Sequence, residues 1–405
     1  MIKKATGNRQ QATGKNPPLR QNQALSNQRP FSHGGNVYAF ARALDVEFDD
    51  VLDFSASINP LGMPRGARLA YRQALHRVMH YPEPHAESLV QALAAYHDVN
   101  PACLLAGNGS TQLIYTVARA FHPRRVLLIA PLFSEHAAAF RASGAQVEHF
   151  ILRPPTFALA LESLERRLRA TPYDVLVLTN PNSPTGALVL HEQVSELVRL
   201  CRRMRTRLLV DETFIDWVEG ETVKKLAARD ANVLVLRSMT KFFVLPGLRI
   251  GYAIAPPRVV QQLREQIEPW SINVAAQEVG IACLQDRKFI ERSRKFLHSE
   301  RAWLYARLQA IPGLHVFSSQ ANFLLMQLLR QDITASELAC RLAQDKLLIR
   351  VCDNFVGLGK QFVRIAVRRR AENRRLLEVL HTVGSSGINT MSRTGPGGRS
   401  GGTCA

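Results

Sequence analysis

Long hydrophobic runs are absent from this sequence. No stretch approaches the roughly 18 uninterrupted apolar residues of a membrane span, so we expect a soluble protein that does not enter a membrane. Cysteine is scarce too: the 6 cysteines form no CxxC pair and have no histidine at metal-ligand spacing, which argues against any metal site and predicts reduced thiols in the cytoplasm. No internal repeat is visible, which excludes a repeat architecture.

Acidic residues are outnumbered. The chain has 33 Asp and Glu against 52 Lys and Arg, a net charge of +19, yet no basic cluster is interleaved with aromatic residues. We therefore favour a protein that binds anionic small molecules over one that binds nucleic acid. Residues 1–30 lack acids and are nearly free of large apolar groups, so we expect a disordered leader, with an organellar transit peptide as the alternative. The Gly- and Ser-rich segment 384–405 is expected to be a disordered tail.

Between these ends, short apolar runs alternate with helical periods. Four runs have the length of strands buried on both faces: RVLLIA (125–130), DVLVLT (174–179), RLLVD (207–211) and NVLVLR (232–237). Apolar residues from Val194 to Met204 recur at helical spacing and can pack on a sheet. Strands that alternate with helices predict an α/β fold with a doubly wound, mostly parallel sheet.

A second group of elements begins near residue 274. A long helix-forming stretch leads into the runs GLHVF, NFLLMQL, LLIRV and FVRIAV, with a helix near 335–344 and a last helix from Ala371. At 405 residues, a large and a smaller lobe are more common than a single core. The domains we expect are an N-terminal arm that contributes to the functional site (31–65), a large domain (66–273), and a linking long helix with a small α+β domain (274–383).

Three polar residues follow the ends of predicted strands. Asp211 closes RLLVD, Asn182 lies in the turn TNPNSPTG after DVLVLT, and Lys241 follows the strand that ends at Arg237. Ligands of an open parallel sheet bind outside the carboxyl ends of the strands. A carboxylate, an amide and an amine that converge there could hold a pyridine ring, with the acid at the ring nitrogen, the amide at the phenolic oxygen and the amine at the aldehyde.

The segment AGNGSTQLIY (106–115) offers a place for a phosphate. Its two glycines, Ser110 and Thr111 stand at the start of an apolar-periodic helix, where free amides and the helix dipole attract anions. Arg249, in LPGLRIGYA, could reach the same phosphate as a charged fork. The alternative interpretation is a glycine turn with a serine N-cap.

Taken in chain order, GNGST, NPNSPTG, DETFIDW, SMTKFF and PGLRIGYA resemble the motifs of the fold-type I pyridoxal-phosphate enzymes, the aminotransferase superfamily. Within it, HGGN (33–36), LDFSASINPLGMP (52–64), YPEP (81–84) and LLIRVCDNFVGLG (347–359) resemble the L-threonine-O-3-phosphate decarboxylases of cobalamin synthesis, near relatives of the histidinol-phosphate aminotransferases. The resemblance extends over residues 32 to about 382. It implies pyridoxal 5'-phosphate as the cofactor.

The resemblance also implies the cofactor contacts. Lys241 would bond to the cofactor aldehyde and Asp211 would face the ring nitrogen, and these two are the catalytic residues. Asn182 would hold the ring oxygen, and Tyr81 would reach the cofactor phosphate of a neighbouring subunit, which implies a homodimer with shared active sites. The remaining contacts, to the phosphate and the ring face, would come from Gly109, Ser110, Thr111, Ser238, Arg249 and Phe133.

The implied substrate is a small phosphorylated amino acid. His33 and Arg350 resemble the groups that bind its phosphate, and Arg364 resembles the arginine that binds its carboxylate. The full set of implied substrate-binding residues is His33, Gly35, Asn182, Arg350 and Arg364. Three residues depart from the family pattern: Ser57 stands where we expect Asn, Thr213 where a small residue is usual, and Trp217 where Phe is usual.

The resemblance implies decarboxylation of L-threonine O-3-phosphate to (R)-1-amino-2-propanol O-2-phosphate. The alternative is a histidinol-phosphate-type aminotransferase that uses glutamate or 2-oxoglutarate. The two activities differ in which bond of the substrate Cα the pocket holds perpendicular to the cofactor ring. A basic cofactor-binding or nucleic-acid-binding regulator without catalytic activity is a third possibility, against which the absence of a helix-turn-helix pattern before residue 31 argues.

Overall fold

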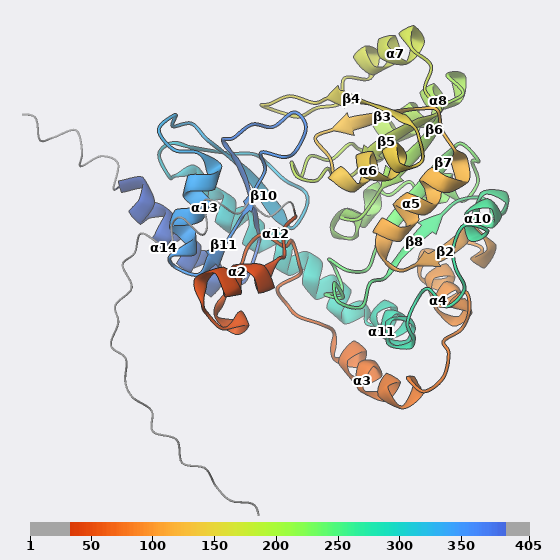
Figure 1. Cartoon of the computed structure of the whole chain (residues 1–405), viewed down its shortest axis with the longest axis horizontal. Helices are drawn as coiled ribbons and strands as arrows, with labels where there is room; N and C mark the ends of the chain where they lie inside the picture. The colour runs from red at the N-terminus through yellow and green to blue at the C-terminus, as the bar shows by residue number, and fades with distance from the viewer. Residues whose placement is uncertain (1–32, 386–405) are drawn as a thin grey trace, which may run out of the picture.

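The computed structural model describes residues 33–385. The leader expected over 1–30 lies outside them, as does the expected tail except for Gly384 and Ser385, which belong to the last helix, α14 (Arg370–Ser385). Gly384 and Ser385 are therefore helical, contrary to the expected start of the tail at residue 384. In Figure 1 a large sheet with its helices lies to the right and a smaller lobe to the left.

A seven-stranded sheet organises the large lobe, in the order β2-β8-β7-β6-β5-β3-β4. Its strands are β2 (Leu104–Gly107), β3 (Arg125–Ala130), β4 (Gln146–Ile151), β5 (Val175–Thr179), β6 (Arg207–Asp211), β7 (Val233–Ser238) and β8 (Gly251–Ile254). Only β8 runs antiparallel to its neighbours, so the carboxyl ends of the other six meet at one edge. The four expected runs are β3, β5, β6 and β7. Sequence analysis missed β2, β4 and β8, which are short or half-exposed.

Both faces of this sheet are buried because alternate strand residues enter different cores. Along β5, Val175 and Val177 belong to one apolar cluster, and Leu176 and Leu178 belong to the other. The first cluster is covered by α5 (Gly109–Phe121), α6 (Ser134–Ala142) and α10 (Pro257–Arg264). The second is covered by α4 (Glu87–His97), α7 (Leu161–Ala170), α8 (His191–Arg203), α9 (Lys224–Ala227) and α11 (Val274–Gln285). Helices on both faces confirm the doubly wound α/β fold.

The long helix-forming stretch expected from residue 274 is helical but is divided in two. The structure has two helices, α11 (Val274–Gln285) and α12 (Arg287–Gln309), which are separated at Asp286. The Asp286 backbone is not helical, and its side chain accepts a hydrogen bond from the amide of Phe289 at 2.9 Å, so it caps α12. Helix α11 packs on α3 (Arg65–Ala74) and α4, whereas α12 crosses to the small lobe (Figure 1).

The small lobe is an antiparallel sheet in the order β12-β13-β10-β9, with β9 (Leu314–Val316), β10 (Phe323–Leu328), β12 (Arg350–Val351) and β13 (Phe362–Ala366). Helices α13 (Ala335–Ala343) and α14 belong to the same lobe. The run LLIRV is divided: β11 (Leu347–Leu348) pairs in parallel with β1 (Leu52–Asp53), and after Ile349 the chain joins β13 instead. Residues 52–53 of the expected arm therefore pair with a strand of this lobe, which the sequence did not indicate.

The remaining elements lie at the periphery. Helix α2 (Val37–Leu44) flanks the small lobe, and α3 projects away from the sheet at the lower edge of Figure 1. The short 3-10 turns are η1 (Phe48–Asp50), η2 (Leu75–Arg77), η3 (Pro101–Cys103) and η4 (Ile215–Glu221). No helix among residues 33–385 has the length and apolar character needed to cross a bilayer.

Candidate active site

A cavity of about 250 Å³ opens at the carboxyl edge of the parallel strands. It is lined by residues of the arm, the large sheet and the small lobe. Ten residues that the sequence singled out line it: His33, Ser110, Thr111, Phe133, Asp211, Ser238, Lys241, Arg249, Arg350 and Arg364. The structure therefore brings together residues from segments that are more than 300 positions apart in the sequence.

The other four predicted residues lie outside the lining. Gly109 packs against the Arg249 side chain, and Gly35 donates its amide to Ser55 Oγ at 2.7 Å. Asn182 Nδ2 donates to the Pro131 carbonyl at 2.8 Å, while its Oδ1 accepts from Thr185. Tyr81 is on the outer surface and is 83% exposed. Within one chain, Tyr81 does not contribute to the cavity.

Lys241 begins the segment after β7, and the arm fixes its backbone. The amide of Asn59 donates to the Lys241 carbonyl at 3.0 Å, and Asn59 Nδ2 donates to the Phe242 carbonyl at 3.0 Å. Burial, together with Arg364 and Arg249 nearby, lowers the pKa of Lys241 from 10.5 to about 8. An amine with this pKa is neutral often enough near physiological pH to act as a nucleophile.

Asp211 ends β6, and both of its carboxylate oxygens have protein partners. Thr213 donates to Oδ1 from its hydroxyl at 2.6 Å and from its amide at 3.0 Å. His136, on α6, lies with Nε2 2.9 Å from Oδ2. Burial alone would raise the pKa of Asp211, but the contacts with His136 and Thr213 lower it below its usual value, so the group is held as a carboxylate.

The amino end of α5 fits the expected phosphate-binding site. Asn108, the N-cap residue, makes no side-chain capping hydrogen bond, so the first-turn amides of Ser110 and Thr111 remain available to an anion. Gly109 has φ +79°, and a Cβ there would lie 2.4 Å from Nη2 of Arg249. The glycine is therefore needed for the arginine to reach this turn.

Two arginines of the small lobe enter the cavity side by side. Arg350 of β12 and Arg364 of β13 are direct cross-strand partners. Arg364 donates to Ser183 Oγ at 2.9 Å and to the Ser55 carbonyl at 3.1 Å, and burial lowers its pKa to about 10. Arg350 donates to Asn354 Oδ1 at 2.7 Å. Together they contribute two positive charges to the lining of the cavity.

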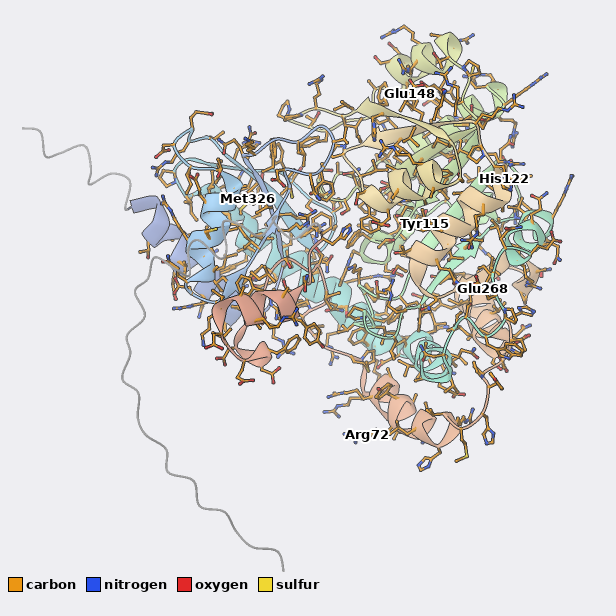
Figure 2. The ribbon with its side chains drawn as sticks, in the orientation of Figure 1. Arg72, Tyr115, His122, Glu148, Glu268 and Met326 are labelled. Atoms are coloured by element: carbon orange, nitrogen blue, oxygen red, sulfur yellow. The ribbon has the colours of Figure 1, made fainter. Side chains whose placement is uncertain are left out.

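His33 stands at the arm side of the cavity. Its Nε2 lies 3.4 Å from a carboxylate oxygen of Glu135, and its ring contacts the ring of Phe133 edge-on at 5.6 Å. Glu135 in turn accepts a hydrogen bond from Tyr115, which Figure 2 labels on α5. The rings of His33 and Phe133 thus line the cavity in contact with each other.

A buried ion cluster beneath the strand ends was not foreseen. Arg237, fully buried, directly precedes Ser238 and lies 3.0 Å from Glu212, 3.0 Å from Asp216 and 2.6 Å from Glu219. Glu212 directly follows Asp211. The cluster therefore ties together the backbones of two neighbouring strand ends that carry site residues. Glu212 and Asp216, two acids of this cluster, lie in the motif DETFIDW. Their presence in that motif is the sequence signal that could have revealed the cluster.

Three buried polar atoms around the cavity have no hydrogen-bond partner: Ser57 Oγ, Thr179 Oγ1 and Arg364 Nε. Buried polar groups are normally satisfied, so such atoms indicate that a polar ligand completes the site. Together with the uncapped α5 terminus, the lysine and the carboxylate, they fit a phosphorylated pyridine aldehyde. Among residues 33–385, no three His, Cys, Asp or Glu side chains gather as metal ligands.

Comparisons with known proteins agree with this geometry. The family of class I and II aminotransferases matches residues 49–380. A threonine-phosphate decarboxylase of Salmonella typhimurium is 38% identical over 87% of this chain and 96% of its own. The structure of L-threonine-O-3-phosphate decarboxylase from Porphyromonas gingivalis superposes with a TM-score of 0.73 at 26% identity, covering 82% of this chain and 98% of that one. Histidinol-phosphate aminotransferase from Clostridium acetobutylicum gives a TM-score of 0.78 at 27% identity, with coverages of 83% and 100%.

Proposed function

The chain belongs to the class I and II aminotransferase family, and from that premise we propose that it is the pyridoxal-phosphate-dependent decarboxylase of L-threonine O-3-phosphate in cobalamin synthesis. The product is (R)-1-amino-2-propanol O-2-phosphate. The observation that carries this proposal is the 38% identity with the Salmonella decarboxylase over nearly its whole length. The cavity supports the substrate class, because two arginines on adjacent strands suit a molecule with two anionic groups.

Pyridoxal 5'-phosphate fits the residues that are present. Lys241 would bond to its aldehyde, and Asp211 would hold its ring nitrogen in the protonated form. Asn182, which the resemblance assigns to the ring oxygen, lies outside the cavity lining, and its Nδ2 donates to the Pro131 carbonyl. The phosphate would be bound by Gly109, Ser110, Thr111, Ser238 and Arg249, and Phe133 would cover the ring. When bound, the cofactor supplies an electron sink for the bond that breaks at the substrate Cα.

The chain's own groups then determine the reaction. Arg364 binds the substrate carboxylate and Arg350, with His33, binds the phosphate, so two substituents of the substrate are fixed. Which Cα bond stands perpendicular to the ring follows from these two contacts. Lys241, whose pKa of about 8 allows it to exchange a proton near neutral pH, returns a proton to Cα after carbon dioxide has left.

A histidinol-phosphate-type aminotransferase is the second candidate. It is favoured by the TM-score of 0.78 with the Clostridium acetobutylicum enzyme, against 0.73 for the Porphyromonas gingivalis decarboxylase. The same residues would serve it, with the Cα–H bond perpendicular to the ring. It requires a second substrate, 2-oxoglutarate, which the decarboxylase does not.

We also propose a homodimer with shared active sites. Exposed apolar side chains concentrate in one patch formed by α3, η2 and the following loop, which contains Leu69, Tyr71, Leu75, Val78, Met79 and Tyr81, with Trp270 beside Tyr81. Arg72, labelled in Figure 2, marks this helix at the edge of the molecule. A patch of this kind on a lone chain is typical of an interface, and a second copy would bring its Tyr81 to the cofactor phosphate.

The location we propose is the cytoplasm. All cysteines among residues 33–385 are free thiols, as expected in a reducing compartment.

The experiment that tests the function uses the purified protein loaded with pyridoxal phosphate. L-threonine O-3-phosphate is added without any keto acid, and carbon dioxide and aminopropanol phosphate are followed. Catalytic release of both supports the decarboxylase, and Lys241→Ala must abolish it. No release, together with formation of glutamate from 2-oxoglutarate when histidinol phosphate is supplied as the amino donor, would reject the decarboxylase in favour of the aminotransferase.

Shared sites are tested by mixing two inactive variants. Lys241→Ala and Tyr81→Ala protomers are combined after partial dissociation. A mixed dimer contains one site with an intact Lys241 from one chain and an intact Tyr81 from the other, so activity should return. No recovery, or a monomer by light scattering, would contradict the dimer.

A further inference from the structure

Thr213 makes a contact with Asp211 that the family resemblance does not explain. Thr213 offers two donors to one carboxylate oxygen: its hydroxyl Oγ1 lies 2.6 Å from Asp211 Oδ1, and its amide donates to the same oxygen at 3.0 Å.

We propose that Thr213 is a positioning residue, whose hydroxyl holds the Asp211 carboxylate in its ionised form and in one orientation, so that the proton shared with the cofactor stays on the ring nitrogen. The inference rests on the proposed function, since it concerns the partner of that nitrogen. No covalent bond is made or broken by Thr213. Its effect is on where one proton resides.

The two oxygens of the Asp211 carboxylate offer about four acceptor positions. Three are occupied in the protein, two on Oδ1 by Thr213 and one on Oδ2 by His136 Nε2 at 2.9 Å. One acceptor position is left on a carboxylate that lines the cavity. The ring N–H is thus directed to a single site on the carboxylate.

The hydrogen bond from Thr213 also affects the proton affinity of the Asp211 carboxylate. Each hydrogen bond donated to a carboxylate stabilises its ionised form and makes it a weaker base. A proton between the ring nitrogen and Asp211 therefore stays on the nitrogen more firmly when Thr213 donates. A protonated ring nitrogen makes the ring the stronger electron sink. Without the hydroxyl, the proton moves toward the carboxylate and the ring withdraws electrons less well.

The surroundings of Thr213 keep its hydroxyl in place. Its β-branched side chain restricts rotation about χ1. The next residue, Phe214, is buried and packs edge-on against Phe323 of β10 at 5.0 Å, which fixes the backbone that follows β6. His136, the other partner of Asp211, is fully buried on α6. The carboxylate is therefore held between the sheet edge and one helix.

Thr213 could instead serve only to close the turn after β6, since an Asp side chain that accepts from the amide two residues on is a common turn element. The two roles are separated by Thr213→Val, which keeps the shape and the amide but removes the hydroxyl. Thr213→Ser keeps the hydroxyl and is the rescue variant. The matched control is Thr206→Val at the other end of β6, where the lost hydroxyl donates to the Tyr173 carbonyl at 2.8 Å, far from the cavity edge.

The decisive readout is the 15N NMR shift of the bound cofactor, labelled at its ring nitrogen, in holoenzyme without substrate. We expect Thr213→Val to move this shift toward the unprotonated nitrogen and to lower kcat while leaving the KM for substrate nearly unchanged, because the hydroxyl acts on the proton at the ring nitrogen and does not touch the substrate. Thr213→Ser and Thr206→Val should keep the wild-type shift.

An unchanged 15N shift in Thr213→Val, with only a lower melting temperature, would show a purely structural turn and overturn the inference. Should Thr213→Val fail to fold, Thr213→Ala provides the same comparison without the bulk of valine. Failure of the wild-type chain to bind pyridoxal phosphate would instead overturn the proposed function itself, so the two failures are distinguishable.

Discussion

The pKa of Lys241 predicts an unusual pH dependence for the stability of the cofactor-free chain. In the folded protein, burial and the charges of Arg364 and Arg249 lower this pKa from 10.5 to about 8. In the unfolded chain the amine keeps its ordinary value of about 10.4. Between these two values the unfolded state binds more protons, so the free energy of unfolding rises with pH across this window. Below about pH 8 both states are protonated and the folded state carries the full penalty.

The magnitude follows from the size of the shift. At about 1.4 kcal/mol per pKa unit, the penalty reaches about 3 kcal/mol below pH 8. Lys241→Met, of similar length and uncharged, should therefore be more stable than wild type by up to about 3 kcal/mol at pH 7, with the difference shrinking toward zero near pH 10.5. Denaturant titrations of both cofactor-free proteins across this pH range measure it.

The control is Lys288→Met, which removes an exposed lysine from α12 and should leave no pH-dependent difference of this kind. Other groups that titrate in the window are shared by variant and wild type, so they cancel in the comparison. A stability difference between Lys241→Met and wild type that stays constant from pH 7 to 10.5 would refute the reasoning, because it would mean that the folded state leaves the amine at its ordinary pKa.

Three further perturbations test other parts of the site. Arg350→Ala should raise the KM for a phosphorylated substrate by far more than for its unphosphorylated parent, and equal effects in steady-state assays would reject the phosphate role. Arg237→Met leaves the buried acids Glu212 and Asp216 without their cation, although Glu219 keeps Lys224, so chemical denaturation should show a loss of about 3–5 kcal/mol, and a loss under about 1 kcal/mol would contradict the cluster's importance. Gly109→Ala places a side chain on a left-handed backbone, which costs about 1–2 kcal/mol, and makes that side chain clash with Arg249. Equilibrium dialysis should therefore show cofactor binding that is at least about tenfold weaker. Unchanged affinity would count against the proposed phosphate-binding site.

Much of the large lobe could be predicted because its signals are local. Runs such as RLLVD and DVLVLT are apolar throughout, which is typical of strands covered on both faces, and the structure has β6 and β5 there. Residues that follow such strands must meet at one edge, so Asp211 and Lys241 could be brought together without any knowledge of contacts. Both line the cavity.

Features that depend on non-local contacts could not be predicted. Nothing in LLIRV shows that the chain pairs with β1 before Ile349 and with β13 after it. The first of these partners, β1, lies almost 300 residues earlier in the sequence. The break at Asp286 is a local signal that was overlooked: an Asp three residues before an apolar position can cap a helix. His136 was visible in PLFSEH, but only the packing of α6 against the sheet places it on Asp211.

The division of the site between two lobes explains why the reaction is harder to infer than the cofactor. The groups that suit the cofactor stand at strand ends of one rigid sheet, so their spacing is set by the fold. The two arginines belong to β12 and β13 of the other lobe, and Arg364 is tied to the large lobe through Ser183 and to the arm through the Ser55 carbonyl. A small shift of these contacts would rotate the substrate about its Cα and change which bond stands perpendicular to the ring. The choice between decarboxylation and transamination therefore depends on how the arm and the small lobe meet the sheet, a tertiary property that no single motif encodes.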